Sequence, residues 1–157
     1  MARYVALLRG INVGGKNLIP MPALKAAFEE HGFDDVRTYI QSGNVVFSTP
    51  TSSQVTLTRE IEQTISTTFA HYEASVVLRS RSQMRAIVDR APNGFGAEPS
   101  KYRYDVVFLK APLTAKTASK GARSVGGGSV DQATDGGFAG GNSNGSLTLG
   151  QKPEAGN

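Results

Sequence analysis

Hydrophobic residues in the first 80 positions of the chain recur with two different spacings. Short runs rich in Val, Tyr, Ile and Phe are typical of β-strands, and apolar residues three or four positions apart are typical of helices that bury one face. The strand-like runs are Arg3–Leu8, Val36–Ile40, Val45–Ser48 and Ala74–Leu78. The helix-like sets are Leu24, Ala27 and Phe28, between Pro20 and Gly32, and then Leu57, Ile61, Ile65 and Phe69. The pattern therefore predicts the element order β-α-β-β-α-β.

The second and third strands are predicted to form a β-hairpin around a Ser-Gly-Asn turn. With a two-residue loop, Val36 and Ile40 fall on the same face as the apolar residues of the returning strand. Phe33, directly after Gly32, is suited to supply the apolar contact of a helix C-cap. The residues that we expect to be buried are Leu7, Leu24, Phe28, Ile40, Phe47, Ile61 and Ile65.

A third helix and one further strand are predicted beyond position 80. Met84, Ile87 and Val88 indicate the helix, which Pro92 ends, and Tyr104–Leu109 reads as the strand. The expected fold class is α+β: a ferredoxin-like β-α-β-β-α-β unit followed by an incomplete second ferredoxin-like subdomain. The expected divisions of the chain are 1–80, 81–115 and 116–157.

The last division has a different composition from the rest of the chain. Eleven of the 18 glycines lie between Gly121 and Gly156, interleaved with Ser, Asn and Asp, and hydrophobic periodicity is lost. Such a segment buries too little apolar surface to offset roughly 1–2 kcal/mol of backbone entropy per residue. We therefore expect a disordered tail without strand or helix after about Gly121. It is either a flexible linker or not a natural continuation of the domain.

Composition excludes several kinds of chemistry. The chain has no cysteine, which excludes disulfides, thiolate catalysis and cysteine-bound metal. Two histidines, His31 and His71, are too few for a typical zinc site, so no metal is expected. No apolar run approaches the roughly 18 residues of a membrane span, and Tyr4–Leu8 is too short for a signal-peptide core. We expect a cytoplasmic protein with no membrane partner, whose oligomeric state does not follow from the sequence.

The segment Arg9–Asn17 is the strongest candidate site. Three glycines (Gly10, Gly14 and Gly15) let backbone N–H groups approach a phosphate or carboxylate, and Arg9 and Lys16 add positive charge where a strand leads into a helix. The alternative is a connecting loop that needs glycine for positive φ, with Asn12 and Asn17 satisfying backbone groups. Because Lys16 is followed by Asn17 and not by Ser or Thr, the segment is no P-loop.

The predicted hairpin turn offers a second group of polar side chains. Gln41, Ser42 and Asn44 lie at a rigid turn, where they could hydrogen-bond to a ligand. The alternative is ordinary turn chemistry, in which glycine and asparagine serve the backbone. The net charge of +4 permits an anionic partner without implying one.

A nucleic-acid-binding or protein-binding module is the competing interpretation. Tyr4 and Tyr39 could lie on the open face of the sheet and stack on bases, as in ferredoxin-like RNA-binding domains. Four arginines surround the third predicted helix and could contact phosphates, although a solvated basic face is the plainer interpretation: Arg79, Arg81, Arg85 and Arg90. No nucleophile–base–acid set can be assembled, so catalytic residues, cofactor and the question of enzymatic activity stay open.

Two long motifs in the right order resemble those of the bacterial family catalogued as domain of unknown function 1697. They are Tyr4–Gly15, followed by a Met-x-x-Leu helix start at Met21 and Leu24, and Thr38–Val45. The resemblance covers roughly residues 2–115 and implies a duplicated ferredoxin-like α+β protein, without an activity. Family members continue with two more strands and a helix preceded by an Arg-Asn-Trp-like segment. This chain has no tryptophan and is rich in glycine and serine there, which a frameshift or a truncated reading would explain.

Overall fold

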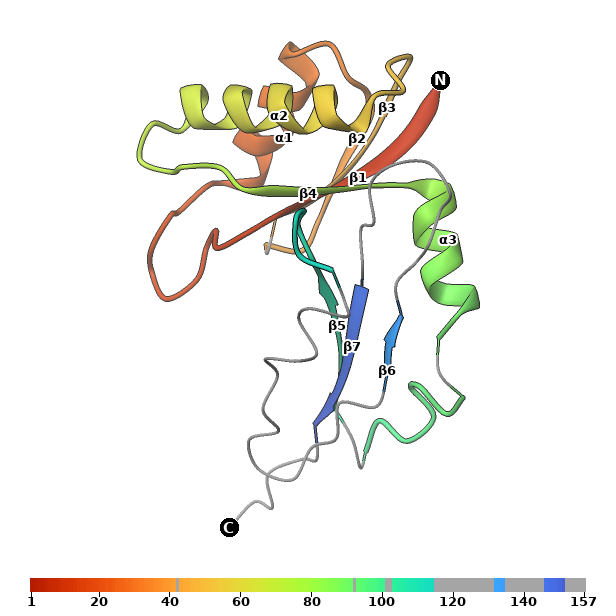
Figure 1. Cartoon of the computed structure of the whole chain (residues 1–157). Helices are drawn as coiled ribbons and strands as arrows, with labels where there is room; N and C mark the ends of the chain where they lie inside the picture. The colour runs from red at the N-terminus through yellow and green to blue at the C-terminus, as the bar shows by residue number, and fades with distance from the viewer. Residues whose placement is uncertain (42, 92, 101–102, 115–131, 135–145, 152–157) are drawn as a thin grey trace. The chain divides into compact units, whose positions relative to one another are not determined.

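The computed structural model describes residues 1–41, 43–91, 93–100, 103–114, 132–134 and 146–151. The chain divides into two compact units, Met1–Met84 (unit 1) and Arg85–Asn157 (unit 2). The elements are β1 (Ala2–Leu8), α1 (Met21–Glu30), β2 (Asp34–Tyr39), β3 (Asn44–Thr49), α2 (Gln54–Thr68), β4 (Val76–Ser80), α3 (Arg81–Asp89), β5 (Arg103–Phe108), β6 (Gln132–Thr134) and β7 (Ser146–Gln151) (Figure 1). Helices accompany antiparallel strand pairs, which makes the fold α+β, as predicted.

Unit 1 contains a four-stranded sheet in the order β2-β3-β1-β4, and each neighbouring pair is antiparallel. The six elements predicted for this part of the chain are present in the predicted order. The last residues of β1 lie opposite the first residues of two other strands: Leu7 pairs with Asn44 of β3, and Leu8 pairs with Val76 of β4. The loops attached to these strand ends therefore gather at one end of the sheet.

One face of the sheet packs against both helices of unit 1 (Figure 1). Alternate residues of β1 are buried on this face, beginning with Tyr4, whose ring lies 5.9 Å from that of Phe47 on β3. The helices contribute side chains that are at most 1% exposed: Leu24 and Phe28 from α1, and Leu57, Ile61 and Ile65 from α2. Tyr4 is thus a core residue, which excludes the open-face position considered for it, because its strand position points it toward the helices.

The end of α1 has the predicted glycine cap. Gly32 has a φ of +97°, and the Phe33 N–H donates to the Phe28 carbonyl oxygen at 3.2 Å, a bond typical of a Schellman motif. The rings of Phe28 and Phe33 lie 5.7 Å apart, so the expected apolar contact is confirmed.

The hairpin differs from the prediction at its turn. Tyr39 and Asn44 are the last strand pair, so the loop is the four-residue segment 40–43 and not two residues. Ile40 has a φ of +51° and is 59% exposed, so its expected burial is wrong. The positive φ ends the alternation of β2 one residue early, and the side chain leaves the core face. Leu7, also expected in the core, is half-buried.

Unit 2 contains a three-stranded antiparallel sheet in the order β5-β7-β6. Two of its strands, β6 and β7, lie in the segment that we expected to contain none, so that expectation is wrong for residues 132–134 and 146–151. The sequence of β7 alternates polar or small residues with Leu147 and Leu149, a two-residue period that is short but sufficient to pair with β5. The other positions of 116–157 lie outside the described residues.

Candidate functional site

Three loops meet at the end of the unit 1 sheet where β1 finishes. They are the segment Arg9–Asn17 (the glycine loop), the hairpin turn 40–43, and the connection 69–75 between α2 and β4. The Leu8 N–H donates to the Gly43 carbonyl oxygen at 2.9 Å, and the Arg9 N–H donates to the Ser75 carbonyl oxygen at 3.0 Å. The glycine loop therefore begins between the other two loops and is bonded to both.

The backbone of the glycine loop turns sharply because five of its nine residues have positive φ. These are Gly10 (+71°), Asn12 (+53°), Gly14 (+60°), Gly15 (+73°) and Asn17 (+51°). Its tip is a tight turn in which the Lys16 N–H donates to the Val13 carbonyl oxygen at 3.1 Å. Two consecutive residues with positive φ are typical of a type I′ turn, which confirms the expected need for glycine here.

The side-chain amide of Asn12 holds the glycine loop in place. Its Nδ2 donates to the Ile19 carbonyl oxygen at 3.0 Å and to the Gln41 carbonyl oxygen at 2.9 Å. Its Oδ1 accepts a hydrogen bond from the Ile19 N–H at 2.8 Å. Every bond reaches backbone, so the Asn12 side chain serves the fold, which is the alternative role that the sequence allowed. A ligand that accepts a hydrogen bond from this amide would have to replace one of the two bonds that Nδ2 donates.

Two further side chains restrain the same loop. Asn17 Nδ2 donates to the Gly10 carbonyl oxygen at 2.9 Å, which closes the loop from end to end. The hydroxyl of Tyr72, a residue that is 5% exposed, donates to the Arg9 carbonyl oxygen. These bonds fix the backbone at both ends of the glycine loop.

The two cations of the loop have no partner in the described part of the chain. Arg9 and Lys16 are both exposed, and neither side chain forms a hydrogen bond or an ion pair with the residues that the structure describes. The helix that follows, α1, adds little attraction for an anion, because Pro20 is its N-cap and Pro22 lacks an N–H in its first turn. Any attraction for an anion would therefore come from the two side chains and the exposed turn at Gly14 and Gly15.

The polar residues of the hairpin serve its turn. Gln41 contributes its carbonyl oxygen to Asn12, and Asn44 Nδ2 donates to the Tyr39 carbonyl oxygen at 3.3 Å. Ser42, the third hairpin residue in the predicted site, lies outside the described residues. Gly43 has a φ of +82°, and a Cβ added there would lie 2.6 Å from Cδ1 of Ile11. The sequence did not reveal this close approach between the hairpin and the glycine loop.

Tyr72 is a second residue that sequence reasoning missed. Burial raises the pKa of its phenol, the neighbouring Glu62 carboxylate raises it further, and the charge of Arg9 lowers it. The hydrogen bond from this hydroxyl to the Arg9 carbonyl oxygen places the phenol at the start of the glycine loop. A signal was present in the sequence, because Tyr72 lies three positions after Phe69 and extends the apolar spacing of α2.

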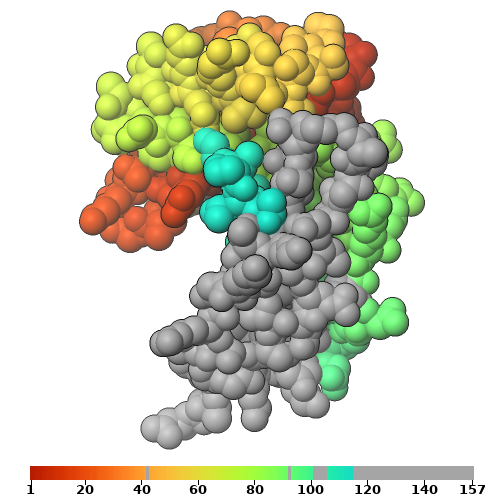
Figure 2. All heavy atoms as spheres, in the orientation of Figure 1, coloured from red at the N-terminus to blue at the C-terminus, as the bar shows by residue number. Residues whose placement is uncertain are grey.

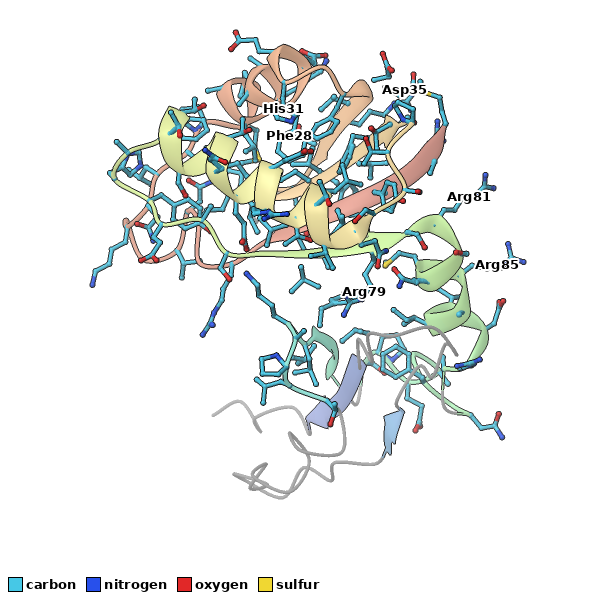
Figure 3. All side chains as sticks on the ribbon, turned by 45° about the horizontal axis from the view of Figure 1, so that its top comes forward. Phe28, His31, Asp35, Arg79, Arg81 and Arg85 are labelled. Atoms are coloured by element: carbon cyan, nitrogen blue, oxygen red, sulfur yellow. The ribbon has the colours of Figure 1, made fainter. Side chains whose placement is uncertain are left out.

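The arginines proposed as a nucleic-acid surface do not form one cluster of free charges. Arg79 is 3% exposed, its Nη1 donates to the Leu78 carbonyl oxygen at 2.9 Å, and burial lowers its pKa. Arg85 forms an ion pair with Asp89 at 3.3 Å, whereas Arg81 and Arg90 are exposed. Figure 3 shows Arg81 and Arg85 pointing outward from α3. Buried Arg79 is unsuited to contact a phosphate backbone.

The two histidines make hydrogen bonds to neighbouring elements. Nδ1 of His31 lies 3.0 Å from Oγ1 of Thr64, and Nε2 of His71 lies 3.2 Å from the Leu18 carbonyl oxygen. Within the described ranges, no group of three or more His, Cys, Asp or Glu side chains could hold a metal ion. Along the same residues, no helix is long and apolar enough to cross a membrane.

Comparisons with known proteins give one family and one fold. The family model described as "Protein of unknown function (DUF1697)" matches residues 1–130. No curated protein matches the chain. The solved structure of the conserved bacterial protein SP0830 from Streptococcus pneumoniae is similar with a TM-score of 0.73 and 24% identity, and the match covers 98% of this chain and 78% of that one. At this identity the similarity shows the fold alone.

Proposed function

Since the chain belongs to the DUF1697 family of bacterial proteins of unknown function, family membership assigns no reaction, and we propose a function from the glycine loop itself. We propose that the chain binds a small anionic ligand, one bearing a phosphate or a carboxylate, through Arg9, Lys16 and the turn at Gly14 and Gly15. One observation carries this proposal: hydrogen bonds fix the loop backbone while both cations are exposed and have no partner among the described residues.

Preorganisation is the physical reason for the proposal. A loop that is already ordered loses little conformational freedom when a ligand arrives, so more of the interaction energy contributes to affinity. Asn12, Asn17 and Tyr72 provide that order through bonds to backbone groups. The Asn12 and Asn17 side chains therefore support the proposed site, and we no longer propose them as ligand contacts; Gln41 supports it through its backbone carbonyl, and its side chain stays a proposed contact.

The finer description of the fold belongs to the same proposal. We infer that unit 1 is ferredoxin-like, because the strand order β2-β3-β1-β4, with antiparallel neighbours and both helices on one face, is the order expected of a β-α-β-β-α-β unit. We infer in addition that the residues after it, within 81–115, begin a second subdomain. A cytoplasmic location belongs to the proposal as well.

The nucleic-acid alternative has less support than the anion site. It would need aromatic side chains on the open face, but Tyr4 is in the core and only Tyr39, 69% exposed, is available. It would also need free cations in a row, but Arg79 is buried and Arg85 is paired. In the described part of the chain, Tyr39 and the scattered arginines give neither a stacking surface nor a concentrated charge.

The direct test is a titration of the full chain with inorganic phosphate by isothermal calorimetry. Replacing Arg9 or Lys16 with alanine should weaken binding by about 1–3 kcal/mol, since each would remove a charge-assisted hydrogen bond. Arg59→Ala is the matched control, because Arg59 is an exposed arginine on α2 outside the three loops. It should leave the affinity unchanged.

Two outcomes would contradict the proposal. In the first, phosphate and small carboxylates fail to bind the unmodified chain at low salt. In the second, Arg59→Ala weakens binding as much as Arg9→Ala does, which would indicate a general charge effect and not a site. Binding of single-stranded RNA that survives Arg9→Ala and Lys16→Ala would favour the nucleic-acid alternative instead.

A further inference from the structure

Three exposed aliphatic side chains lie beside the proposed anion site. Val13 is 64% exposed, Leu18 is 61% exposed and Ile40 is 59% exposed. A single exposed aliphatic residue is ordinary on a protein surface, whereas several gathered in one place indicate a binding surface. These three residues therefore indicate a binding surface only if they lie close together.

The hydrogen bonds of Asn12 bring the three residues together. Val13 follows Asn12 in the chain, Leu18 precedes Ile19, and Ile40 precedes Gln41, and the Asn12 amide bonds to both Ile19 and Gln41. Consecutive Cα atoms are about 3.8 Å apart, so all three aliphatic residues lie within roughly 10 Å of one side-chain amide. The glycine loop stands out from the rest of unit 1 in Figure 2, where it is orange-red.

Positive charge lies on the same loop as Val13. Lys16 is in the same turn as Val13, and Arg9 begins the loop. An inorganic anion would use the charges and leave Val13, Leu18 and Ile40 in water. A ligand that also has an aliphatic part would cover both kinds of surface.

Building on the proposed function, we infer that the site takes an acid with an aliphatic chain. The phosphate or carboxylate head would contact Arg9, Lys16 and the glycine turn, and the chain would cover Val13, Leu18 and Ile40. Each methylene of the ligand that leaves water at this surface strengthens binding by up to about fourfold. Affinity should therefore rise with chain length, which a purely electrostatic site would not show.

The experiment compares inorganic phosphate, butyl phosphate and octyl phosphate on the full chain, below the concentration at which the alkyl phosphates form micelles. We expect octyl phosphate to bind at least tenfold more tightly than inorganic phosphate. Val13→Ser, Leu18→Ser and Ile40→Ser should each reduce that advantage at least threefold and leave the affinity for inorganic phosphate unchanged. Val55→Ser on α2 is the control, because Val55 is 60% exposed and outside these loops. Circular dichroism checks that each variant is folded.

The outcomes separate this inference from the function on which it rests. If phosphate and octyl phosphate bind equally well, the inference is wrong and the anion site stands. If none of the three probes binds, both are wrong. If Val55→Ser reduces the chain-length effect as much as Val13→Ser does, the aliphatic contact is nonspecific and the inference is overturned. Binding to phosphatidylglycerol vesicles without binding to monomeric octyl phosphate would overturn it in favour of a lipid surface.

Discussion

The side-chain amide of Asn12 donates to the carbonyl oxygen of Gln41 across 2.9 Å, although the two residues are 29 positions apart in the chain. This bond joins the glycine loop after β1 to the turn between β2 and β3. The same Nδ2 also donates to the Ile19 carbonyl oxygen, just before α1. One side chain therefore fixes the relative positions of three segments around the proposed site.

Replacing Asn12 with alanine should destabilise unit 1 strongly. The Ile19 N–H and the carbonyl groups of Ile19 and Gln41 would lose their partners, at an expected cost of about 2–4 kcal/mol. Asn17→Ala is the control, because Asn17 has almost the same φ (+51° against +53°) and a single side-chain hydrogen bond in the described structure. Urea unfolding measures both. Equal losses would show that backbone strain, and not the Asn12 bonds, accounts for the effect.

Gly43 should tolerate alanine far less well than Gly14 does. Both have positive φ, which costs alanine about 1–2 kcal/mol at either position. At Gly43 the new Cβ would also meet Cδ1 of Ile11 at 2.6 Å, whereas nothing lies within 4 Å at Gly14. Overpacking should add about 1–3 kcal/mol at Gly43 alone. Thermal unfolding of the two variants gives the comparison, and similar melting temperatures would contradict the close approach.

The clash at Gly43 can be tested through its partner. Ile11→Val removes Cδ1, the atom nearest to the added Cβ. In a Gly43→Ala background this change should cost less than it does in the unmodified chain, because it relieves the shortest of the three overlaps, those with Ile11 Cδ1 (2.6 Å), Ile11 Cγ1 (2.9 Å) and Leu8 Cβ (2.9 Å). A double-mutant cycle on the free energy of unfolding measures the coupling, which we expect to be favourable by about 0.5–2 kcal/mol. If the effects of Ile11→Val and Gly43→Ala on the free energy of unfolding are additive, the Ile11 side chain is not the source of the strain at Gly43.

Stability should fall at high pH through Tyr72. Burial raises the pKa of its phenol above the ordinary 10.0, so its contribution is complete below pH 10.0 and is lost as the pH rises through the folded value. Tyr72→Phe removes this titration and the bond to Arg9, at an expected cost of about 0.5–1.5 kcal/mol near neutral pH. Its stability should then change less steeply with pH above 10.0 than that of the unmodified chain.

Tyr39→Phe is the control for that pH profile, because Tyr39 is 69% exposed. It should leave the alkaline slope of the unmodified chain intact. Unfolding free energies from urea denaturation at a series of alkaline pH values provide the measurement. If Tyr72→Phe and the unmodified chain lose stability in parallel, the phenol does not titrate differently in the folded state.

Much of unit 1 was predictable because its elements bury regular faces. Leu57, Ile61 and Ile65 step by four and are all at most 1% exposed, as a helix with one apolar face requires. The Gly32 cap was also predictable, because glycine is the residue that most readily takes a positive φ. These signals are local, and each depends on a few neighbouring residues.

The errors lie where the local pattern is interrupted or depends on distant residues. Ile40 was expected in the core, but Ile is a rare residue at positive φ, and nothing nearby signals the longer turn. The open face was considered for Tyr4 because one strand alone does not say which of its faces the helices cover. The strand β7 was missed because Gly-rich sequence surrounds it and its partner β5 is about 40 residues away.

The conformation of the glycine loop was predictable from its residues, but the hydrogen bonds that hold it were not. Glycine and asparagine content identified the loop, and the positive φ values of Gly10, Gly14 and Gly15 agree with it. The bonds from Asn12 to Gln41 and from Tyr72 to Arg9 join positions 29 and 63 residues apart, so no local pattern contains them. Those bonds move Asn12 from a ligand contact to a support for the loop.

A phosphate titration followed by amide NMR spectra of the full chain tests the central claim most directly, because it locates the binding site residue by residue. The account predicts that the largest shifts occur at the Gly14 and Gly15 amides, that Lys16→Ala moves them to higher phosphate concentrations, and that Arg59→Ala leaves them intact. Shifts spread evenly over the exposed cations, with none concentrated at the glycine loop, would contradict it.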